Sequence, residues 1–177
     1  MILPIVAYGD PVLKREAEEI EKDYPFLEEL IDNMFETMYQ AEGVGLAAPQ
    51  IGKSIRLFIV DASPFEDEEP ELKDFKKVFI NPIIVEEEGE EWNFNEGCLS
   101  IPGIREDVKR QPKITIEYYD RDFNLLEETY EGVAARIIQH EYDHIEGILF
   151  TDLINPLKRR LLKSKLNNIS KGNVKVP

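Results

Sequence analysis

The two histidines of this sequence lie four residues apart, in the segment QHEYDH at residues 139–144. On a helix, His140 and His144 would share one face and could bind the same metal ion, and Glu141 would lie close enough to reach a metal-bound water. This HExxH pattern is typical of metallohydrolases. A pair of hydrogen-bonded helix histidines without a metal is the alternative, and the pentapeptide alone does not separate the two.

A catalytic site of this kind needs a third protein ligand and an open position for water. The extended motif HExxHxxGxxH matches only through Gly147, because Phe150 stands where its third histidine would be. A downstream carboxylate is limited to Glu146 or Asp152, and both are poorly placed. The candidate is therefore Cys98, the single cysteine, since a thiolate binds divalent iron, zinc, nickel or cobalt well.

Three motifs together resemble those of a known family in order and spacing. They are GVGLAAPQ at 43–50, EGCLS at 96–100 and QHEYDH at 139–144. The family is the peptide deformylases, metallohydrolases that remove the formyl group from N-formylmethionine on new bacterial or organellar polypeptides. The resemblance extends from VAYGDPVL near the N-terminus to the last predicted helix, so it covers nearly the whole chain.

The resemblance implies a role for each matching residue. The metal ligands would be Cys98, His140 and His144, the general acid/base Glu141, and the oxyanion donors the Gln50 side chain and the Leu99 backbone N–H. A metal-bound hydroxide would attack the formyl carbon, and formate would leave as the amine is protonated. The resemblance also implies Fe²⁺ as the native ion, with Ni²⁺, Co²⁺ or Zn²⁺ able to replace it, and N-formylmethionyl nascent peptides as substrates.

The substrate's methionine side chain requires an apolar slot near these residues. We expect it to be lined by Val44, Gly45, Leu99, Val133 and Ile137.

Two acidic residues beside the motifs are candidates for supporting roles. We expect Glu96 to orient a metal ligand, and Glu42 to pair with Arg110 and brace the glycine-rich loop. Ordinary surface charge is the alternative for both.

Two other functions stay open at this point. An HExxH peptidase would use the same groups to cut an internal amide, and would release peptide fragments in place of formate. A non-catalytic binding module would hold a structural metal, but such a site is normally closed by a fourth protein ligand, and no second cysteine or third histidine exists.

Helices are predicted wherever apolar residues recur at helical spacing. The pattern predicts an amphipathic helix over about 25–41, a helix through HEYDH between Gly132 and Gly147, and a C-terminal helix over about 156–168 that is capped by Asn155. The expected fold is α+β, with mixed or antiparallel strands packed around the HEYDH helix.

Strands are predicted from runs of β-branched and aromatic residues. They are expected at 55–61, at 77–89 with a break at Asn81-Pro82, and in a hairpin around DRDFN at 120–124. The acidic stretches 61–75 and 86–91 are expected to be solvated loops and nothing more.

Composition limits where the protein works and what it binds. The 177 residues, 42% of them hydrophobic, suit a single domain over 1–177, and the lone cysteine excludes an internal disulfide. No secretory signal or membrane-spanning run is evident, so we expect a cytoplasmic protein.

Charge is distributed unevenly along the chain. The net charge of −15 argues against binding of nucleic acid or anionic membrane by the body of the protein. Residues 153–177, however, carry seven Lys or Arg and no acid. This segment is expected to be an ordinary solvated helix, with a docking helix for an acidic partner as the alternative; some bacterial members of the family it resembles use this helix to dock near the ribosomal exit.

Overall fold

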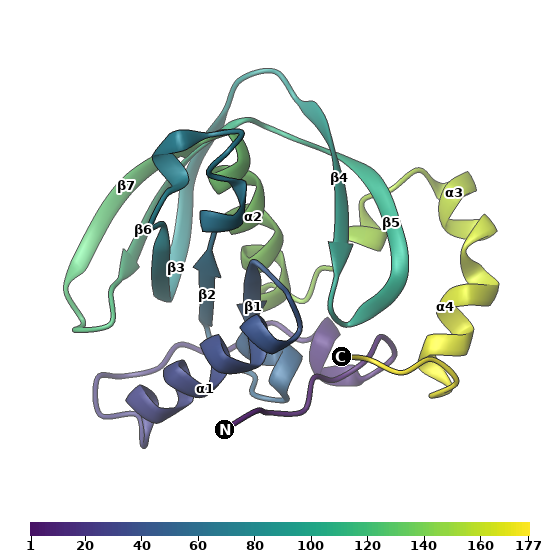
Figure 1. The fold of residues 1–177 in the computed structure, drawn as a ribbon, viewed down its shortest axis with the longest axis horizontal. Helices are drawn as coiled ribbons and strands as arrows, with labels where there is room; N and C mark the ends of the chain where they lie inside the picture. The colour runs from purple at the N-terminus through teal and green to yellow at the C-terminus, as the bar shows by residue number, and fades with distance from the viewer.

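Two antiparallel sheets lie on either side of a central helix in the computed structural model, which describes residues 1–177 (Figure 1). The strands are β1 (Gly45–Ala47), β2 (Leu57–Asp61), β3 (Lys76–Glu88), β4 (Trp92–Cys98), β5 (Ile101–Arg110), β6 (Lys113–Tyr119) and β7 (Leu125–Glu131). One sheet has the order β1-β2-β3-β6-β7, and β4 and β5 form a separate hairpin. The predicted α+β class with antiparallel strands is confirmed.

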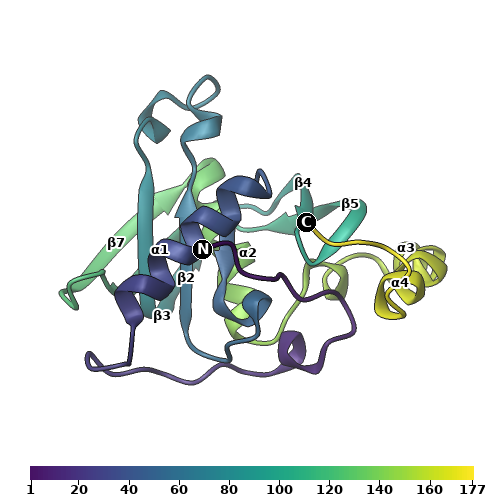
Figure 2. The ribbon, with the colours of Figure 1, turned by 60° about the horizontal axis from the view of Figure 1, so that its bottom comes forward.

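The helices occupy three different places around these sheets. Their bounds are α1 (Leu27–Gln40), α2 (Gly132–Ile145), α3 (Pro156–Leu161) and α4 (Lys163–Ser170). Helix α2, which carries HEYDH, lies between the five-stranded sheet and the β4–β5 hairpin (Figure 1). Figure 2 shows α1 in front of the large sheet and α2 behind it. None of the helices combines the length and the apolar composition needed to cross a membrane.

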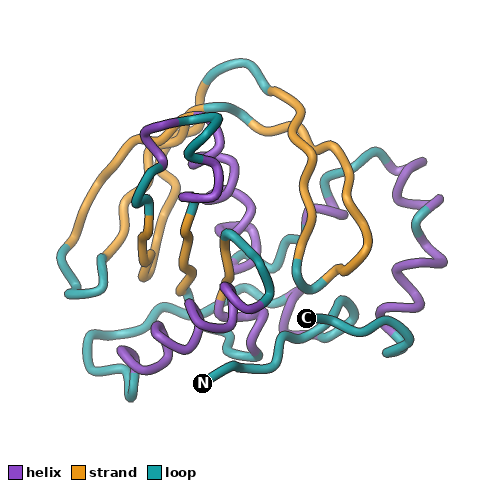
Figure 3. The backbone as a smooth tube through the Cα atoms, in the orientation of Figure 1, coloured by secondary structure: helices purple, strands orange, loops and turns teal.

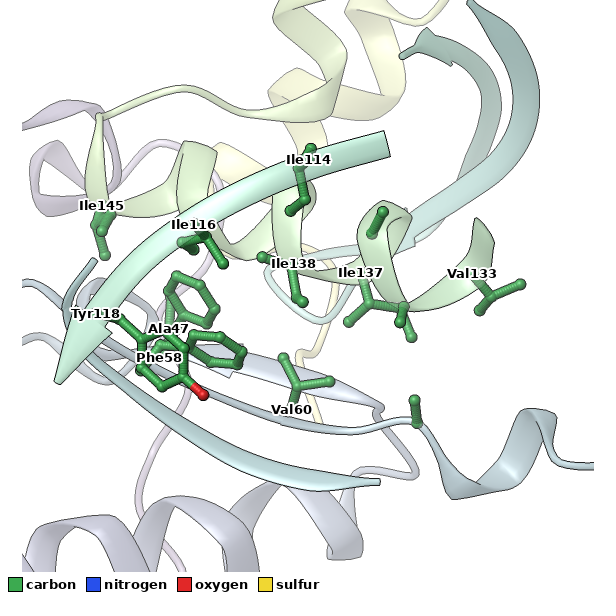
Figure 4. Packing of buried hydrophobic residues seen from close by; sticks show 14 of the residues in the cluster. Ala47, Phe58, Val60, Ile114, Ile116, Tyr118, Val133, Ile137, Ile138 and Ile145 are labelled. Atoms are coloured by element: carbon green, nitrogen blue, oxygen red, sulfur yellow. The ribbon is translucent and has the colours of Figure 1, made fainter. Parts of the chain in front are cut away.

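Strand β2 explains how one sheet holds both helices. Successive side chains of a strand point to opposite faces, so Phe58 and Val60 pack toward α2 while Leu57 and Ile59 pack toward α1. Strand β6 alternates more simply, with its buried residues facing α2. Figure 4 shows side chains of α2 and of the strands meeting in this layer. Packing of α2 against one face of the five-stranded sheet therefore fixes the position of the helix and of the two histidines that it carries.

The C-terminal prediction was partly wrong. Asn155 caps a helix as expected, since its Oδ1 accepts a hydrogen bond from the Leu157 N–H at 2.7 Å. The single helix predicted over about 156–168 is instead divided at Leu162 into α3 and α4 (Figure 3). The division lets α4 turn to bury Leu166 and Ile169 against the β4–β5 hairpin.

Two strand predictions also need correction. Strand β3 continues through Asn81-Pro82, where the pairing with β6 shifts register; Asn81 has a left-handed φ of 49° and its side chain bonds the backbone of Ile20. Residues 86–88 fell both in the predicted strand 77–89 and in the predicted loop 86–91; they belong to β3 and pair with β6, so the loop prediction was wrong for them. The hairpin around DRDFN is confirmed, whereas the β4–β5 hairpin was not predicted.

The acidic segment 61–75 is more than a solvated loop. It begins at the last residue of β2 and contains two short 3₁₀ helices, Ser63–Phe65 and Pro70–Leu72. Its base is closed by a hydrogen bond from the Ala62 N–H to the Phe75 carbonyl, and Leu72 is only 2% exposed. Apolar anchors between the acids thus tie this loop to the core.

Candidate metal centre and its cleft

Three side chains able to bind a metal converge at the C-terminal half of α2. The ligand atoms of Cys98, His140 and His144 all lie within 4.8 Å of one another, and Cys98 Sγ is 3.4 Å from His144 Nε2. Tetrahedral coordination by sulfur and imidazole separates ligand atoms by about 3.5 Å. The donor set and its spacing therefore fit one divalent ion of the zinc or iron type, with a position left for water.

Cys98 reaches the histidines because β4 runs along α2 in the same direction. At the start of the strand, Arg136 Nη2 donates a hydrogen bond to the Trp92 carbonyl at 2.6 Å, and at its end Cys98 meets His144. A register shift between Gly97 and Cys98 ends the regular pairing with β5. Shifts of this kind redirect a side chain, and this one lies at the candidate ligand.

Glu96 fixes the orientation of one histidine from within the protein. Its Oε1 is 2.9 Å from His140 Nδ1, which directs the other ring nitrogen toward the metal position. Arg110 donates two hydrogen bonds to the carboxylate at 2.8 and 3.0 Å, and Arg136 donates another at 3.0 Å. Burial alone would raise the pKa of Glu96, but the bonds from His140 and Arg110 outweigh it and hold the carboxyl ionised.

The expected pair between Glu42 and Arg110 was wrong. Arg110 lies at the end of β5 and faces α2, where it binds Glu96 and, at 2.7 Å, Asp143. The buried carboxylate of Glu96 and the partly buried carboxylate of Asp143 therefore occupy the guanidinium in place of Glu42.

The surroundings of the two histidines shift their pKa values in opposite directions. Burial holds the pKa of His144 well below its usual value, which favours the neutral imidazole that metals require. Burial acts in the same direction on His140, but contacts with Cys98 and Glu96 outweigh it and raise its pKa. Metal binding requires both imidazoles in the neutral form, so metal affinity should fall as the pH is lowered.

Glu141 is held in a buried position next to the glycine-rich segment. Its side chain is 5% exposed, its Oε1 has no hydrogen-bond partner, and burial raises its pKa to about 7. Gly45 lies directly against it, since a Cβ at that position would stand 2.5 Å from Glu141 Oε2. A carboxylate with such a pKa can both accept and return a proton near neutral pH.

Gly45→Ala is expected to displace the Glu141 carboxylate and to lower kcat by about 100-fold, the cost of a shift of about 1 Å in a reacting group. Release of formate, the product that the resemblance implies, measured together with metal content, tests this. Metal content should be unchanged, because the three atoms nearest to a Cβ at Gly45 all belong to Glu141 and none to a candidate ligand. A variant with parental kcat would show that Glu141 does not depend on this close approach.

Gln50 and the turn after Cys98 supply polar hydrogens at the same place. Gln50, 2% exposed, lies in a 3₁₀ helix over Ala48–Ile51, and its Oε1 accepts a bond from the Ala47 N–H at 3.0 Å. That bond aims Nε2 at Cys98 Sγ, 3.4 Å away, and at Ser100 Oγ, 3.2 Å away. Leu99, whose backbone N–H was the other expected oxyanion donor, occupies the two-residue turn between β4 and β5.

A cleft of about 540 Å³ opens beside these groups. Of the residues expected to form the methionine slot, Val44, Gly45, Leu99 and Ile137 line it. Val133 does not line the cleft. It lies one helical turn before Ile137 and belongs to the hydrophobic cluster shown in Figure 4.

Several cleft residues were missed by sequence reasoning. The lining also includes Phe65, Phe94, Arg105 and Arg136. Phe94 could have been found from the alternation along β4, had that strand been recognised. Phe65 comes from the acidic loop, and no local pattern relates that loop to the histidines.

Glu96→Gln is expected to weaken metal binding by about 10- to 100-fold, the usual effect of losing a group that orients a ligand. An amide cannot hold His140 Nδ1–H and two guanidinium groups as a carboxylate does. Titration of the metal-free protein with Zn²⁺ in the presence of a competing chelator measures the change. Glu106→Gln, an alteration of a β5 carboxylate that pairs only with Lys158, is the matched control; equal affinities in all three proteins would contradict the role of Glu96.

The chain resembles proteins of known sequence over nearly its full length. A sequence model described as polypeptide deformylase matches residues 2–160. A peptide deformylase from Christiangramia forsetii is 64% identical over 183 residues, covering 99% of this chain and 93% of the relative. One from Flavobacterium psychrophilum is 63% identical over 182 residues, covering 99% and 94%.

Solved structures agree with the sequence relatives. The peptide deformylase of Thermus thermophilus superposes with a TM-score of 0.86 at 41% identity, covering 97% of this chain and 99% of that one. The Legionella pneumophila peptide deformylase gives a TM-score of 0.85 at 41% identity, with both chains fully covered.

Proposed function

The chain belongs to the peptide deformylase family, metal-dependent hydrolases that remove the N-formyl group from nascent peptides, and we propose that Cys98, His140 and His144 hold its catalytic metal. The convergence of these three side chains on one point, beside the buried carboxylate of Glu141, carries the proposal. Residues 1–177 would form one catalytic domain. We place the reaction in the cytoplasm, where a single unpaired cysteine is expected to stay reduced.

A divalent ion bound by these ligands supplies an activated water near neutral pH. The sulfur and imidazole donors accept Fe²⁺, Ni²⁺, Co²⁺ and Zn²⁺, and we propose Fe²⁺ as the native ion. Glu141 takes the proton of the attacking water, for which its raised pKa suits it, and returns the proton to the leaving amine. Formate and a peptide with a free N-terminus are the products.

Gln50 and Leu99 act on the formyl oxygen. The Gln50 amide is already held in place by the Ala47 N–H, so it can donate to the developing oxyanion without first reorienting. The Leu99 N–H would donate beside it. Loss of one such donor typically costs about 10²–10³ in rate.

The methionine side chain would enter the apolar part of the cleft. Val44, Gly45, Leu99 and Ile137 line it, and Val133 lies one helical turn before Ile137, outside the lining. These residues leave room for an unbranched side chain that can adapt its shape.

The experiment is to incubate formyl-Met-Ala-Ser with protein purified anaerobically and loaded with Fe²⁺ or Ni²⁺. We expect formate and Met-Ala-Ser in equal amounts, and none from protein stripped of metal. Cleavage of an internal amide without formate would instead indicate the HExxH peptidase, and a fully metallated but inert protein would indicate the non-catalytic module.

The basic C-terminal segment is a separate part of the proposal. Lys158, Arg159 and Arg160 lie exposed on α3 and Lys165 lies exposed on α4, and neither helix carries an acid. We propose that this surface docks on ribosomal RNA phosphates where nascent chains emerge. Arg160→Glu combined with Lys165→Glu should reduce co-sedimentation with ribosomes at low salt. Lys53→Glu, an exposed change elsewhere, is the control, and equal co-sedimentation of all three proteins would refute docking.

A further inference from the structure

The acidic loop between β2 and β3 contributes one aromatic side chain to the cleft. Phe65 is the only residue of this loop among those that line it. The loop is a closed unit, tied at its base between Ala62 and Phe75 and anchored by buried Leu72. Its exposed acids therefore surround a fixed apolar wall.

Glu69 of the same loop fixes that wall to α2. Its carboxylate accepts a hydrogen bond from the Val133 N–H, with Oε2 at 3.1 Å and Oε1 at 3.4 Å. Glu131, at the N-cap position of α2, makes no side-chain cap, so a carboxylate 64 residues away in sequence satisfies this helix end and meets its positive dipole. Gly132 makes room for it, since a Cβ there would stand 2.6 Å from Glu69 Oε1.

A backbone hydrogen bond connects Phe65 and Glu69. The Glu69 N–H donates a hydrogen bond to the Phe65 carbonyl at 3.0 Å, as in a single helical turn. Phe65 is thereby held near the N-terminal end of α2. The candidate metal ligands His140 and His144 lie in the C-terminal half of the same helix.

The end of the cleft remote from the ligands is aromatic. The rings of Phe65 and Phe94 meet edge-on with centroids 6.5 Å apart, and Trp92 stacks edge-on against Phe94 at 5.5 Å. The Arg136 guanidinium covers Phe94 at 5.6 Å. Arg136 lies one helical turn before His140. Phe65, Phe94 and Arg136 therefore close the end of the cleft that a substrate side chain would reach if its formyl group lay at the metal position.

We propose that Phe65, held by Glu69, closes the far end of the cleft and sets the length of the first side chain that the enzyme accepts. This inference rests on the proposed function, because it takes the cleft as the slot for the residue that carries the formyl group. The ligand class is an unbranched thioether or alkyl side chain about as long as that of methionine. Phe65 determines specificity, and Glu69 is its positioning residue.

The test compares kcat/KM for formyl-Met-Ala-Ser with kcat/KM for formyl-ethionine-Ala-Ser, whose first side chain is longer by one methylene. One methylene that does not fit typically costs about 10- to 200-fold in discrimination. Phe65→Ala should raise the ethionine-to-methionine ratio at least about 10-fold, with metal content unchanged. A ratio within twofold of the parent's would overturn the proposal, even if activity on the methionine peptide fell.

Two further variants separate a specificity role from a structural one. Glu69→Ala should shift the ratio in the same direction, whereas Glu69→Gln, which keeps an acceptor for the Val133 N–H, should restore most of the parental ratio. Glu68→Gln, an exposed change in the same loop, should leave the ratio unchanged. A shift caused equally by Glu68→Gln would show that the loop's charge, and not Phe65, controls the ratio.

Phe65→Trp keeps the proposal testable if Phe65→Ala does not fold. A larger ring should shorten the slot and favour the formyl-norvaline peptide over the methionine peptide, again by at least about 10-fold. An unchanged preference would overturn the proposal. Failure of the parent protein to release formate from any of these peptides would instead refute the proposed function.

Discussion

Glu141→Gln is expected to lower the kcat of formate release by about 10²–10⁴-fold, the usual range for loss of a general acid/base. Glutamine has nearly the same shape and can occupy the space against Gly45, but its amide cannot accept and return a proton. Glu141 is not among the three converging ligands, so one metal per chain should remain bound. Rate and metal content measured on the same preparation give the comparison.

The control for this prediction is Glu131→Gln, an exposed change just before α2 that should leave kcat unaltered. If Glu141→Gln retained more than a tenth of parental activity with its metal bound, Glu141 would not be the proton carrier. Loss of metal together with activity would instead make it a ligand or a support of one.

Cys98→Ala is expected to weaken metal binding by more than about 100-fold, beyond the range for groups that only orient a ligand. Alanine removes the one anionic donor of the set and leaves two imidazoles, which bind divalent metals far less tightly than a site completed by a thiolate. Metal content after gel filtration, and titration against a competing chelator, measure the effect. Deformylation should be lost in proportion to the metal.

The metal retained by Cys98→Ala can be compared with that retained by Glu96→Gln. Glu96→Gln changes the orientation of His140 but no ligand, so it should retain more metal than Cys98→Ala under the same chelator. The reverse order, or one tightly bound metal in Cys98→Ala, would remove Cys98 from the ligand set.

The candidate site could be predicted largely from the sequence because its parts are local. His140, Glu141 and His144 are placed by the geometry of one helix, and the sequence offers a single cysteine. The apolar periodicity that predicted α1 and α2 reflects burial against the two faces of one sheet. Family resemblance then assigned the roles that spacing alone leaves open.

The residues that sequence reasoning missed depend on contacts between distant segments. Glu69 reaches Val133 across 64 residues, and Phe65 meets Phe94 only after the loop has folded onto the cleft. The ion pairs of Arg110 also depend on distant segments. Its partners Glu96 and Asp143 lie in β4 and α2, and no local pattern indicates that Arg110 pairs with them and not with Glu42. The break between α3 and α4 allows residues of α4 to pack against the β4–β5 hairpin, and this contact cannot be read from helical periodicity in the sequence.

The central claim is that one sulfur and two imidazole nitrogens of this chain bind one divalent ion and leave room for water. X-ray absorption at the zinc edge of protein loaded with one Zn²⁺ tests it directly. The account predicts one sulfur at about 2.3 Å, with nitrogen or oxygen neighbours at about 2.0–2.1 Å and the sulfur signal absent from Cys98→Ser. A zinc shell without sulfur in the parent protein would contradict it.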